Sequence, residues 1–299
     1  MKFIIQSLVL CFSMSLVAQN PTEYEVIQKS LAQKAAMRET SLVKNLPFKN
    51  IGPTVMSGRV ADVSVNPKNV TEFYVGYASG GLWYTNNNGT TFTPVLDNAS
   101  TQNIGDIAVD WEAGTIWVGT GEKNSSRSSY AGIGILKSTD KGATWTHVGL
   151  SDAHHVSRIL INPNNKDEVI VGVIGHLYSS NAERGVFKTV DGGKTWVKSL
   201  FINNETGVID IAVAPENFNI MYAASWERVR KAWSFDGDGN SAAIYKSTDA
   251  GSSWVKIGAN SGFPIGEGVG RIGLAVYNED TVYALHDSQF RRPKDASEK

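Results

Sequence analysis

The hydrophobic positions of this chain come in short runs of alternating apolar and polar residues, rich in β-branched side chains and separated by turn-forming residues. Such alternation predicts β-strands. The runs repeat in a fixed order, which predicts a series of four-stranded antiparallel sheets. First strands are expected at 60–65, 104–109, 156–161, 209–213 and 271–276. Second strands are expected at 73–76, 115–118, 169–172, 220–223 and 281–285, and third strands at 81–84, 134–137, 185–188 and 243–246.

An eight-residue turn follows each third strand. It reads Ser/Thr-x-Asp-x-Gly-x-Thr/Ser-Trp at 138–145, 189–196 and 247–254, with a variant at 85–92. Its third side chain is expected to accept hydrogen bonds within the turn, and the glycine two residues later allows a positive φ. We therefore expect a turn-forming role, and not a catalytic one, for the third residues, which are Asn87, Asp140, Asp191 and Asp249.

The spacing of these turns predicts the fold class. The closing aromatic residues are Phe92, Trp145, Trp196 and Trp254, so the periods are 53, 51 and 58 residues. One propeller blade of four strands fits such a period. We expect an all-β propeller with blades at about 55–98, 99–150, 151–203 and 204–260 and an incomplete fifth at 268–299. Because four and a half blades do not close a ring, the remaining blades are expected C-terminal to Lys299.

The segment before the propeller, which we place at 46–299, has a different pattern. Residues 1–18 read as a secretory signal peptide that contains the chain's one cysteine, Cys11. Residues 19–45 form a helical segment, with a helix at 22–40 that begins at a capping box of Thr22 and Glu25. The mature chain would then lack thiols and be exported, to the periplasm, the cell surface or the medium.

Composition narrows the classes of partner. The chain has 299 residues, a net charge of −1 and 19% charged residues, without a run of basic side chains. Nucleic acid is therefore not an expected partner. No segment after the signal peptide is apolar enough to predict a membrane span.

The links between second and third strands contain the residues best suited to a site. In an antiparallel blade these links lie at the end opposite the eight-residue turns. Arg, His and Trp side chains cluster in the links at 121–130, 175–184 and 225–240. Aromatic rings can stack on sugars and Arg can pair with carboxylates. The candidate ligand-binding residues are Arg59, Arg127, His176, Arg184, Trp226, Arg228 and Trp233. The alternative is that the two Trp side chains cover the blade and the charges are solvated.

Three smaller patterns give weaker indications. One polar or charged residue occupies the same position in each of the first four first strands: Asp62, Asp106, Arg158 and Asp210. We expect these residues to form hydrogen bonds between blades; the alternative is that they ring a ligand or ion. Asp236, Asp238 and Asn240 resemble the start of a calcium loop, but Ser241 and Ser247 stand where an EF-hand needs Gly and Glu, so a plain flexible loop is the main interpretation. His154 and His155 lack metal-ligand spacing, and no metal site or other cofactor is predicted.

The eight-residue turn resembles the Asp-box, the bacterial neuraminidase repeat of sialidases, sortilins and xyloglucanases. The chain as a whole is similar to a secreted bacterial propeller family that is described as sortilin-like or glycosyl-hydrolase-like. The motifs that carry this resemblance are 48–53, 56–59, 78–83, 119–122, 175–177, 183–185 and 226–228.

The resemblance implies an exported propeller that recognises a peptide or glycan on the face opposite its Asp-boxes. One alternative is a glycoside hydrolase with catalytic carboxylates on that face, for which Glu122 and Glu227 are the candidates and Glu183 is a neighbour. A second alternative is a structural module of a larger secreted protein. The chain departs from xyloglucanases, whose catalytic Asp corresponds to Ala78, and from sialidases, because Val60-Ala61 follow Arg59 in place of Ile-Pro.

Overall fold

A computed structural model describes residues 22–46, 58–127 and 129–290 of the chain. Its internal contacts divide the chain into two units, Met1–Asn50 and Ile51–Lys299. The expected signal peptide at 1–18, with Cys11, lies outside the described residues.

The first unit contains one described helix, α2 (Tyr24–Thr40), none of whose residues is buried. The predicted capping box is wrong. The residue that caps the helix is Glu23, without a side-chain hydrogen bond, so Thr22 precedes the cap and Glu25 is the second helical residue. Among the described residues, no helix combines the length and apolarity that a membrane span requires.

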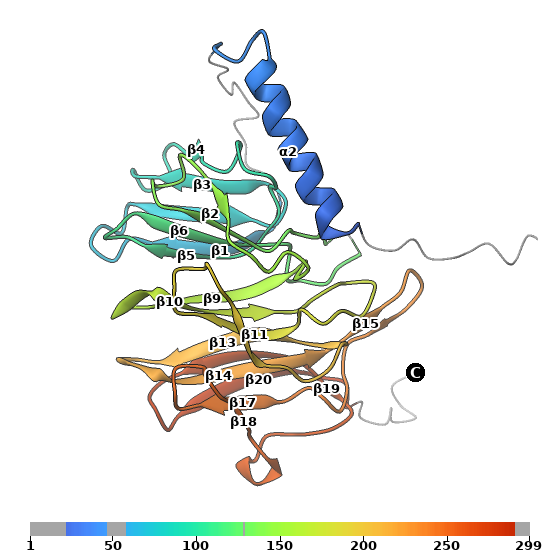
Figure 1. The fold of residues 1–299 in the computed structure, drawn as a ribbon. Helices are drawn as coiled ribbons and strands as arrows, with labels where there is room; N and C mark the ends of the chain where they lie inside the picture. Colours follow the sequence, from blue (N-terminus) through green and yellow to red (C-terminus); the bar gives the residue numbers. More distant parts are fainter. Residues whose placement is uncertain (1–21, 47–57, 128, 291–299) are drawn as a thin grey trace, which may run out of the picture. The chain divides into compact units, whose positions relative to one another are not determined.

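The second unit is a β-propeller segment made of successive antiparallel sheets (Figure 1). The first sheet contains β1 (Val60–Val65), β2 (Phe73–Tyr77), β3 (Gly81–Thr85) and β4 (Thr93–Pro94). The second contains β5 (Ile104–Asp110), β6 (Thr115–Thr120), β7 (Ile135–Ser138) and β8 (Thr146–His147). The third contains β9 (Val156–Asn162), β10 (Asn165–Val173), β11 (Gly185–Thr189) and β12 (Val197–Leu200). The fourth contains β13 (Thr206–Ala214), β14 (Asn217–Glu227), β17 (Ile244–Ser247) and β18 (Val255–Lys256).

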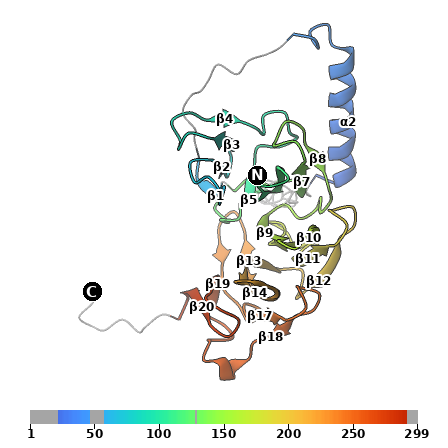
Figure 2. The same cartoon turned by 90° about the vertical axis from the view of Figure 1, so that its left-hand side faces the viewer.

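Three further elements complete the described part. A pair of strands, β19 (Val269–Val276) and β20 (Val282–Ser288), forms a fifth sheet. A short hairpin of β15 (Val229–Arg230) and β16 (Phe235–Asp236) lies within the link between β14 and β17, and a 3-10 turn spans Ala259–Ser261. Figure 2 shows the five sheets following one another in chain order. The predicted fold class is confirmed.

The hydrophobic core lies between neighbouring sheets. Four buried clusters are present among the described residues, and each takes its side chains mainly from two consecutive sheets. Leu82 and Ile116 meet between the first two sheets, for example, and Val186 and Met221 between the third and fourth. A single sheet cannot bury both of its faces, so packing against the next one supplies the hydrophobic stabilisation of the whole array.

The eight-residue turns have the hydrogen bonds that the sequence predicts. The Ser138 hydroxyl and the Thr144 N–H both donate to Asp140 Oδ1, at 2.7 and 2.9 Å, and the Thr144 hydroxyl donates to Oδ2 at 2.6 Å. The bonds from Thr144 and Ser138 lower the pKa of Asp140 to about 2. Gly142 has a φ of +92°, a conformation that glycine adopts without strain. The same three bonds surround Asp191 and Asp249.

In the three turns that close with tryptophan, this residue also links its blade to the preceding one. Trp145 Nε1 donates to the Val95 carbonyl at 2.8 Å, and Trp196 Nε1 donates to the Val148 carbonyl at 2.6 Å. Trp254 makes the equivalent bond to a side-chain oxygen, Ser199 Oγ, at 3.1 Å. The closing residue therefore acts as a polar tie between sheets as well as an apolar anchor.

The polar residues of the first strands join blades, as expected. Asp62 accepts the N–H of Ile107 at 3.2 Å, and Asp106 accepts the N–H of Ile159 at 2.8 Å. Asp210 accepts an N–H of the fifth sheet, that of Leu274, at 2.9 Å. These carboxylates therefore hold the inner strands of successive sheets together.

The two ends of the sheets carry different connections. At one end, which we call the turn face, the N–H groups of Lys141, Gly192 and Ala250 bond back to the chain near the start of the second strand. At the other end, which we call the loop face, the links between second and third strands emerge. Figure 1 shows the longest of these links leaving the fourth sheet at β15.

Candidate functional site

On the loop face, the first and second sheets are joined by an ion pair between two candidate site residues. Arg59 Nε and Nη2 donate to the two carboxylate oxygens of Glu122 at 2.5 and 2.6 Å. The Glu122 carboxylate is fully buried, whereas the Arg59 side chain is half exposed. Asn124 also donates to this carboxylate, at 3.4 Å. Glu122, one of the two catalytic candidates, is thus engaged by a bidentate arginine.

A chain of charges continues from this pair along the inner strands. Lys123 Nζ donates to Asp106 Oδ1 at 2.8 Å, and Arg158 lies 3.6 Å from the same oxygen while it donates to Asp210 at 2.7 Å. Burial raises the pKa of Asp106 to about 6, against the opposing effect of Lys123 and Arg158.

The two tryptophans of the longest link occupy different environments. Trp226 was expected in a loop but lies in β14, where it is 4% exposed and donates through Nε1 to the Gly237 carbonyl at 2.8 Å. The alternative of a tryptophan that covers the blade therefore describes Trp226. Trp233, between β15 and β16, is 81% exposed. Arg127, in the link of the second sheet, is also exposed, and its carbonyl accepts a hydrogen bond from the Tyr178 hydroxyl.

Two arginines of the predicted site are buried next to each other. Arg184 donates to the carbonyls of Ile174, His176, Ser179 and Glu205 at 2.7–3.2 Å. Within the described residues, Arg228 makes one side-chain bond, to the Gly175 carbonyl at 3.2 Å. Burial lowers the pKa of Arg184 to about 10, and burial together with the charge of Arg184 lowers that of Arg228 to about 9.

His176, another predicted site residue, belongs to a cluster of possible metal ligands. Its Nε2 lies 2.8 Å from Asp152 Oδ1, its Nδ1 lies 2.8 Å from Ser179 Oγ, and its ring stacks on His154 at 3.6 Å and 19°. Asp152, His154 and His176 are the one such group among the described residues. Nearly parallel rings do not point their nitrogen lone pairs at a common point, so the arrangement favours a hydrogen-bonded stack over a metal centre.

Two further carboxylates of the loop face, those of Glu227 and Glu183, bond to backbone groups. Glu227 Oε2 accepts the N–H of Ser241 at 2.8 Å, and Glu183 Oε2 accepts the N–H of Asp152 at 2.9 Å. In the segment that resembles the start of a calcium loop, Asp238 accepts the N–H of Gly268 at 2.8 Å, whereas Asp236 is exposed. Neither aspartate belongs to a group of three acidic or histidine side chains in the described part of the chain.

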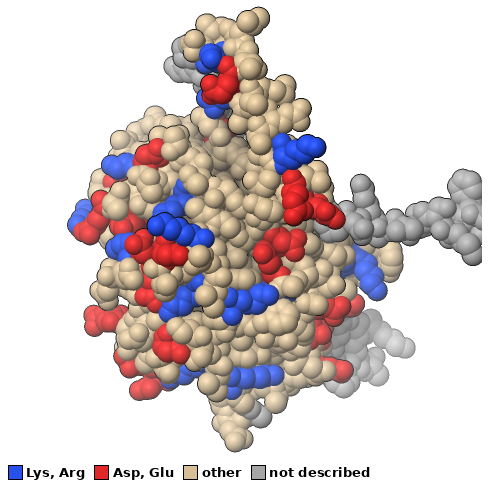
Figure 3. Space-filling view, viewed as in Figure 1, with Lys and Arg blue, Asp and Glu red and all other residues tan. Residues whose placement is uncertain are grey.

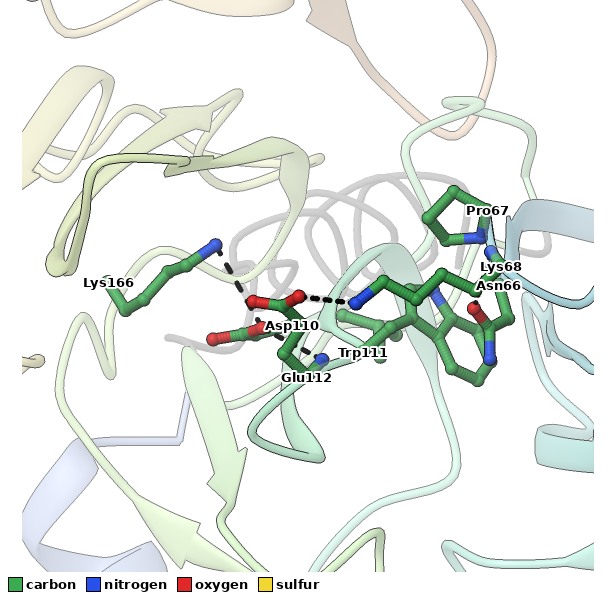
Figure 4. A pocket seen from close by; sticks show the side chains of 8 residues that line it. Asn66, Pro67, Lys68, Asp110, Trp111, Glu112 and Lys166 are labelled. Atoms are coloured by element: carbon green, nitrogen blue, oxygen red, sulfur yellow. Dashed lines mark hydrogen bonds and ion pairs between the residues drawn. The ribbon is translucent and has the colours of Figure 1, made fainter.

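A separate pocket of about 310 Å³ lies near the turn face, between the first, second and third sheets. Figure 4 shows Lys68 and Lys166 reaching toward the carboxylates of Asp110 and Glu112 beside Trp111. Lys68 pairs with Glu112 at 2.6 Å, and Lys166 lies 3.9 Å from Asp110. The charges of this pocket are therefore matched within it. Over the face seen in Figure 3, acidic and basic side chains are likewise interspersed.

Comparisons with known proteins point to carbohydrate-active relatives. Over 254 residues, 76% of this chain, the sequence is 26% identical to a xyloglucanase of Paenibacillus sp., of which the match covers 23%. The chain therefore spans about a quarter of the length of that curated relative. No protein-family model matches the chain.

Solved structures show the same fold. The chain is similar to an ancestral GH74 enzyme, with a TM-score of 0.56 and 20% identity over 78% of this chain and 30% of the other. It is also similar to a hydrazine synthase of Kuenenia stuttgartiensis, with a TM-score of 0.51 and 12% identity over 83% of this chain and 62% of the other. At these identities the likeness to solved structures shows the propeller fold alone.

Proposed function

We propose that this chain contributes blades to an exported, polysaccharide-binding propeller of the glycoside-hydrolase type, and that the polysaccharide binds on the loop face. The observation that supports this most directly is the sequence similarity to a xyloglucanase over 76% of the chain. A polymeric substrate that stays outside the cell agrees with the expected export.

The loop face offers aromatic surface for sugar rings. Each of the three long links presents an exposed aromatic side chain, Tyr130 at 55%, Tyr178 at 55% and Trp233 at 81%, and the last link adds Phe235 at 41%. Exposed aromatic rings supply apolar area against which a pyranose ring can stack, while their polar atoms remain hydrated. Three such residues on neighbouring blades suit a ligand longer than one sugar.

The carboxylates of this face favour a second candidate, binding without hydrolysis. Glycoside hydrolysis needs one carboxyl group to protonate the leaving oxygen and another to act as nucleophile or base. Both oxygens of Glu122 are bonded to Arg59, and Glu227 bonds to the N–H of Ser241. Ala78, where the resemblance would place a catalytic Asp, is buried.

A polysaccharide panel separates these two functions. The protein is incubated with xyloglucan, mixed-linkage β-glucan and starch, and both new reducing ends and retention on each polymer are measured. Hydrolysis of a β-glucan that is lost in Glu122→Gln or Glu227→Gln, and kept in the turn-face control Glu112→Gln, supports the enzyme. Retention without new reducing ends supports binding alone. The absence of both overturns the proposed function.

A further inference from the structure

A small pocket on the loop face is lined by more cationic than acidic side chains. It lies between the link of the third sheet and the end of β14, and its volume is about 180 Å³. Four cationic side chains and one carboxylate line it: Arg184, Arg228, Arg230, Lys231 and Glu205. The remaining lining residues are Leu177, Tyr178, Ser179, Ser180 and Val229.

The central cation of this pocket, Arg228, is only partly hydrogen-bonded. Arg228 is 3% exposed, and neither its Nε nor its Nη1 has a hydrogen-bond partner among the described residues. Arg184, 2% exposed, likewise leaves its Nε unpaired within the described part of the chain. A buried guanidinium without a counter-charge is costly, since burial removes the water that would otherwise solvate it.

Neighbouring groups reduce this cost without removing it. The Arg228 guanidinium lies 5.7 Å from the centroid of the Trp226 ring, over which Arg271 also lies at 5.7 Å. A ring shared by two cations supplies no counter-charge. Glu205 contributes its backbone carbonyl to Arg184, and the charge of its carboxylate opposes the lowering of the Arg184 pKa. Among the described residues, no hydrogen bond or ion pair joins that carboxylate to either guanidinium.

We propose that this pocket binds an oxyanion, a carboxylate or a sulfate group carried by the ligand of the loop face. An oxyanion matches the planar donors of arginine and would offset part of the charge of the Arg184–Arg228 pair. The volume is below that of a whole drug-sized ligand, so it suits a single charged substituent whose parent molecule extends over the exposed Tyr178. The inference concerns binding and does not depend on hydrolysis.

The test uses isothermal titration with sodium glucuronate, sodium sulfate and neutral glucose at one ionic strength held with NaCl. The variant Arg228→Met keeps much of the side-chain length and removes the charge. Lys256→Met, on exposed β18, is the matched control. We expect an anion to bind the wild type and the control alike, with a loss of roughly ten- to a hundredfold in Arg228→Met. Glucuronate binding without sulfate binding identifies a carboxylate source, and the reverse identifies a sulfate.

Three results overturn the proposal: no anion binds, glucose binds as tightly as glucuronate, or Arg228→Met binds the anion as the wild type does. If Arg228→Met does not fold, Lys231→Met replaces it, because Lys231 is exposed and its loss leaves no buried group unpaired. A several-fold weaker anion affinity is expected in Lys231→Met, and an unchanged affinity in that variant contradicts the proposal.

Discussion

Arg59 and Glu122 form a two-pronged ion pair between the first and second sheets, across 63 residues of sequence. A half-exposed arginine therefore supplies the counter-charge of a fully buried carboxylate. Glu122 also accepts a hydrogen bond from His155 Nδ1 through its backbone carbonyl at 2.8 Å, so the residue links three blades. Glu122 therefore holds the first three sheets together at the loop face.

This relationship predicts an unequal effect of two similar substitutions. Arg59→Ala leaves a buried carboxylate without its counter-charge and should clearly lower the midpoint of thermal unfolding. Lys68→Ala breaks a pair whose two side chains are both exposed, at 74% and 72%, and should change it little. Adding Glu122→Gln to Arg59→Ala should restore part of the loss, since it removes the unpaired charge. Equal midpoints for the two single variants would contradict this account.

The raised pKa of Asp106 predicts a stability that depends on pH. In the folded protein the pKa of the Asp106 carboxyl group is about 6, compared with 3.8 for the unperturbed group. The folded state therefore binds more protons than the unfolded chain between about pH 4 and 6, and the contribution of Asp106 to the free energy of unfolding falls as pH rises through that window. The difference is at most about 3 kcal/mol. Urea unfolding from pH 4 to 7 should show a flatter profile in Asp106→Asn than in the wild type, and identical profiles would rule the shift out.

The repeated turn predicts that Asp140, unlike Asp106, loses its stabilising effect at low pH. It also predicts that two substitutions of Asp140 differ in how much they destabilise the protein. Because the pKa of Asp140 is lowered to about 2, the stability it contributes is present above its unfolded pKa and is lost as pH falls toward 2. Asp140→Asn should be milder than Asp140→Ala, since Asn87 already fills this position in the first blade, where it accepts the Thr91 N–H and donates to the Thr91 hydroxyl. Thermal unfolding at pH 7 ranks the two variants, and the reverse order would refute the turn-forming role.

The hydrogen bond that joins two blades at Trp196 predicts a modest loss of stability when it is removed. Trp196→Phe keeps an aromatic anchor and removes the hydrogen bond to the Val148 carbonyl. The expected cost is about 0.5–1.5 kcal/mol in the free energy of unfolding from urea titration. Val197→Thr, at the adjacent and 67% exposed position, should change that energy by less than about 0.5 kcal/mol. A Trp196→Phe protein as stable as the wild type would show that the bond contributes nothing.

Much of the propeller was predictable because its signals are local. Alternation along 60–65 and 73–76 identified strands that the structure has as β1 and β2, with β2 one residue longer. The Asp140 turn was predictable since all its donors lie within four residues. The same offset of Asp62, Asp106 and Asp210 was enough to predict contacts between blades, given a repeat.

The candidate site was harder to predict because its contacts are not local. Nothing in the sequence pairs Arg59 with Glu122. The extension of β14 to Glu227, which buries Trp226, follows from pairing with β13 at Gly207 and not from propensity. The unpaired state of Arg228 emerges only once the third and fourth sheets are packed, since its nearest charges come from Arg184 and Arg230.

The central claim, that a polysaccharide binds on the loop face, is tested most directly by hydrogen–deuterium exchange with and without xyloglucan oligosaccharides. The account predicts slower exchange in the links at 174–184 and 228–243 and unchanged exchange in the eight-residue turns at 138–145 and 189–196. Protection confined to those turns, with the links unaffected, would contradict it.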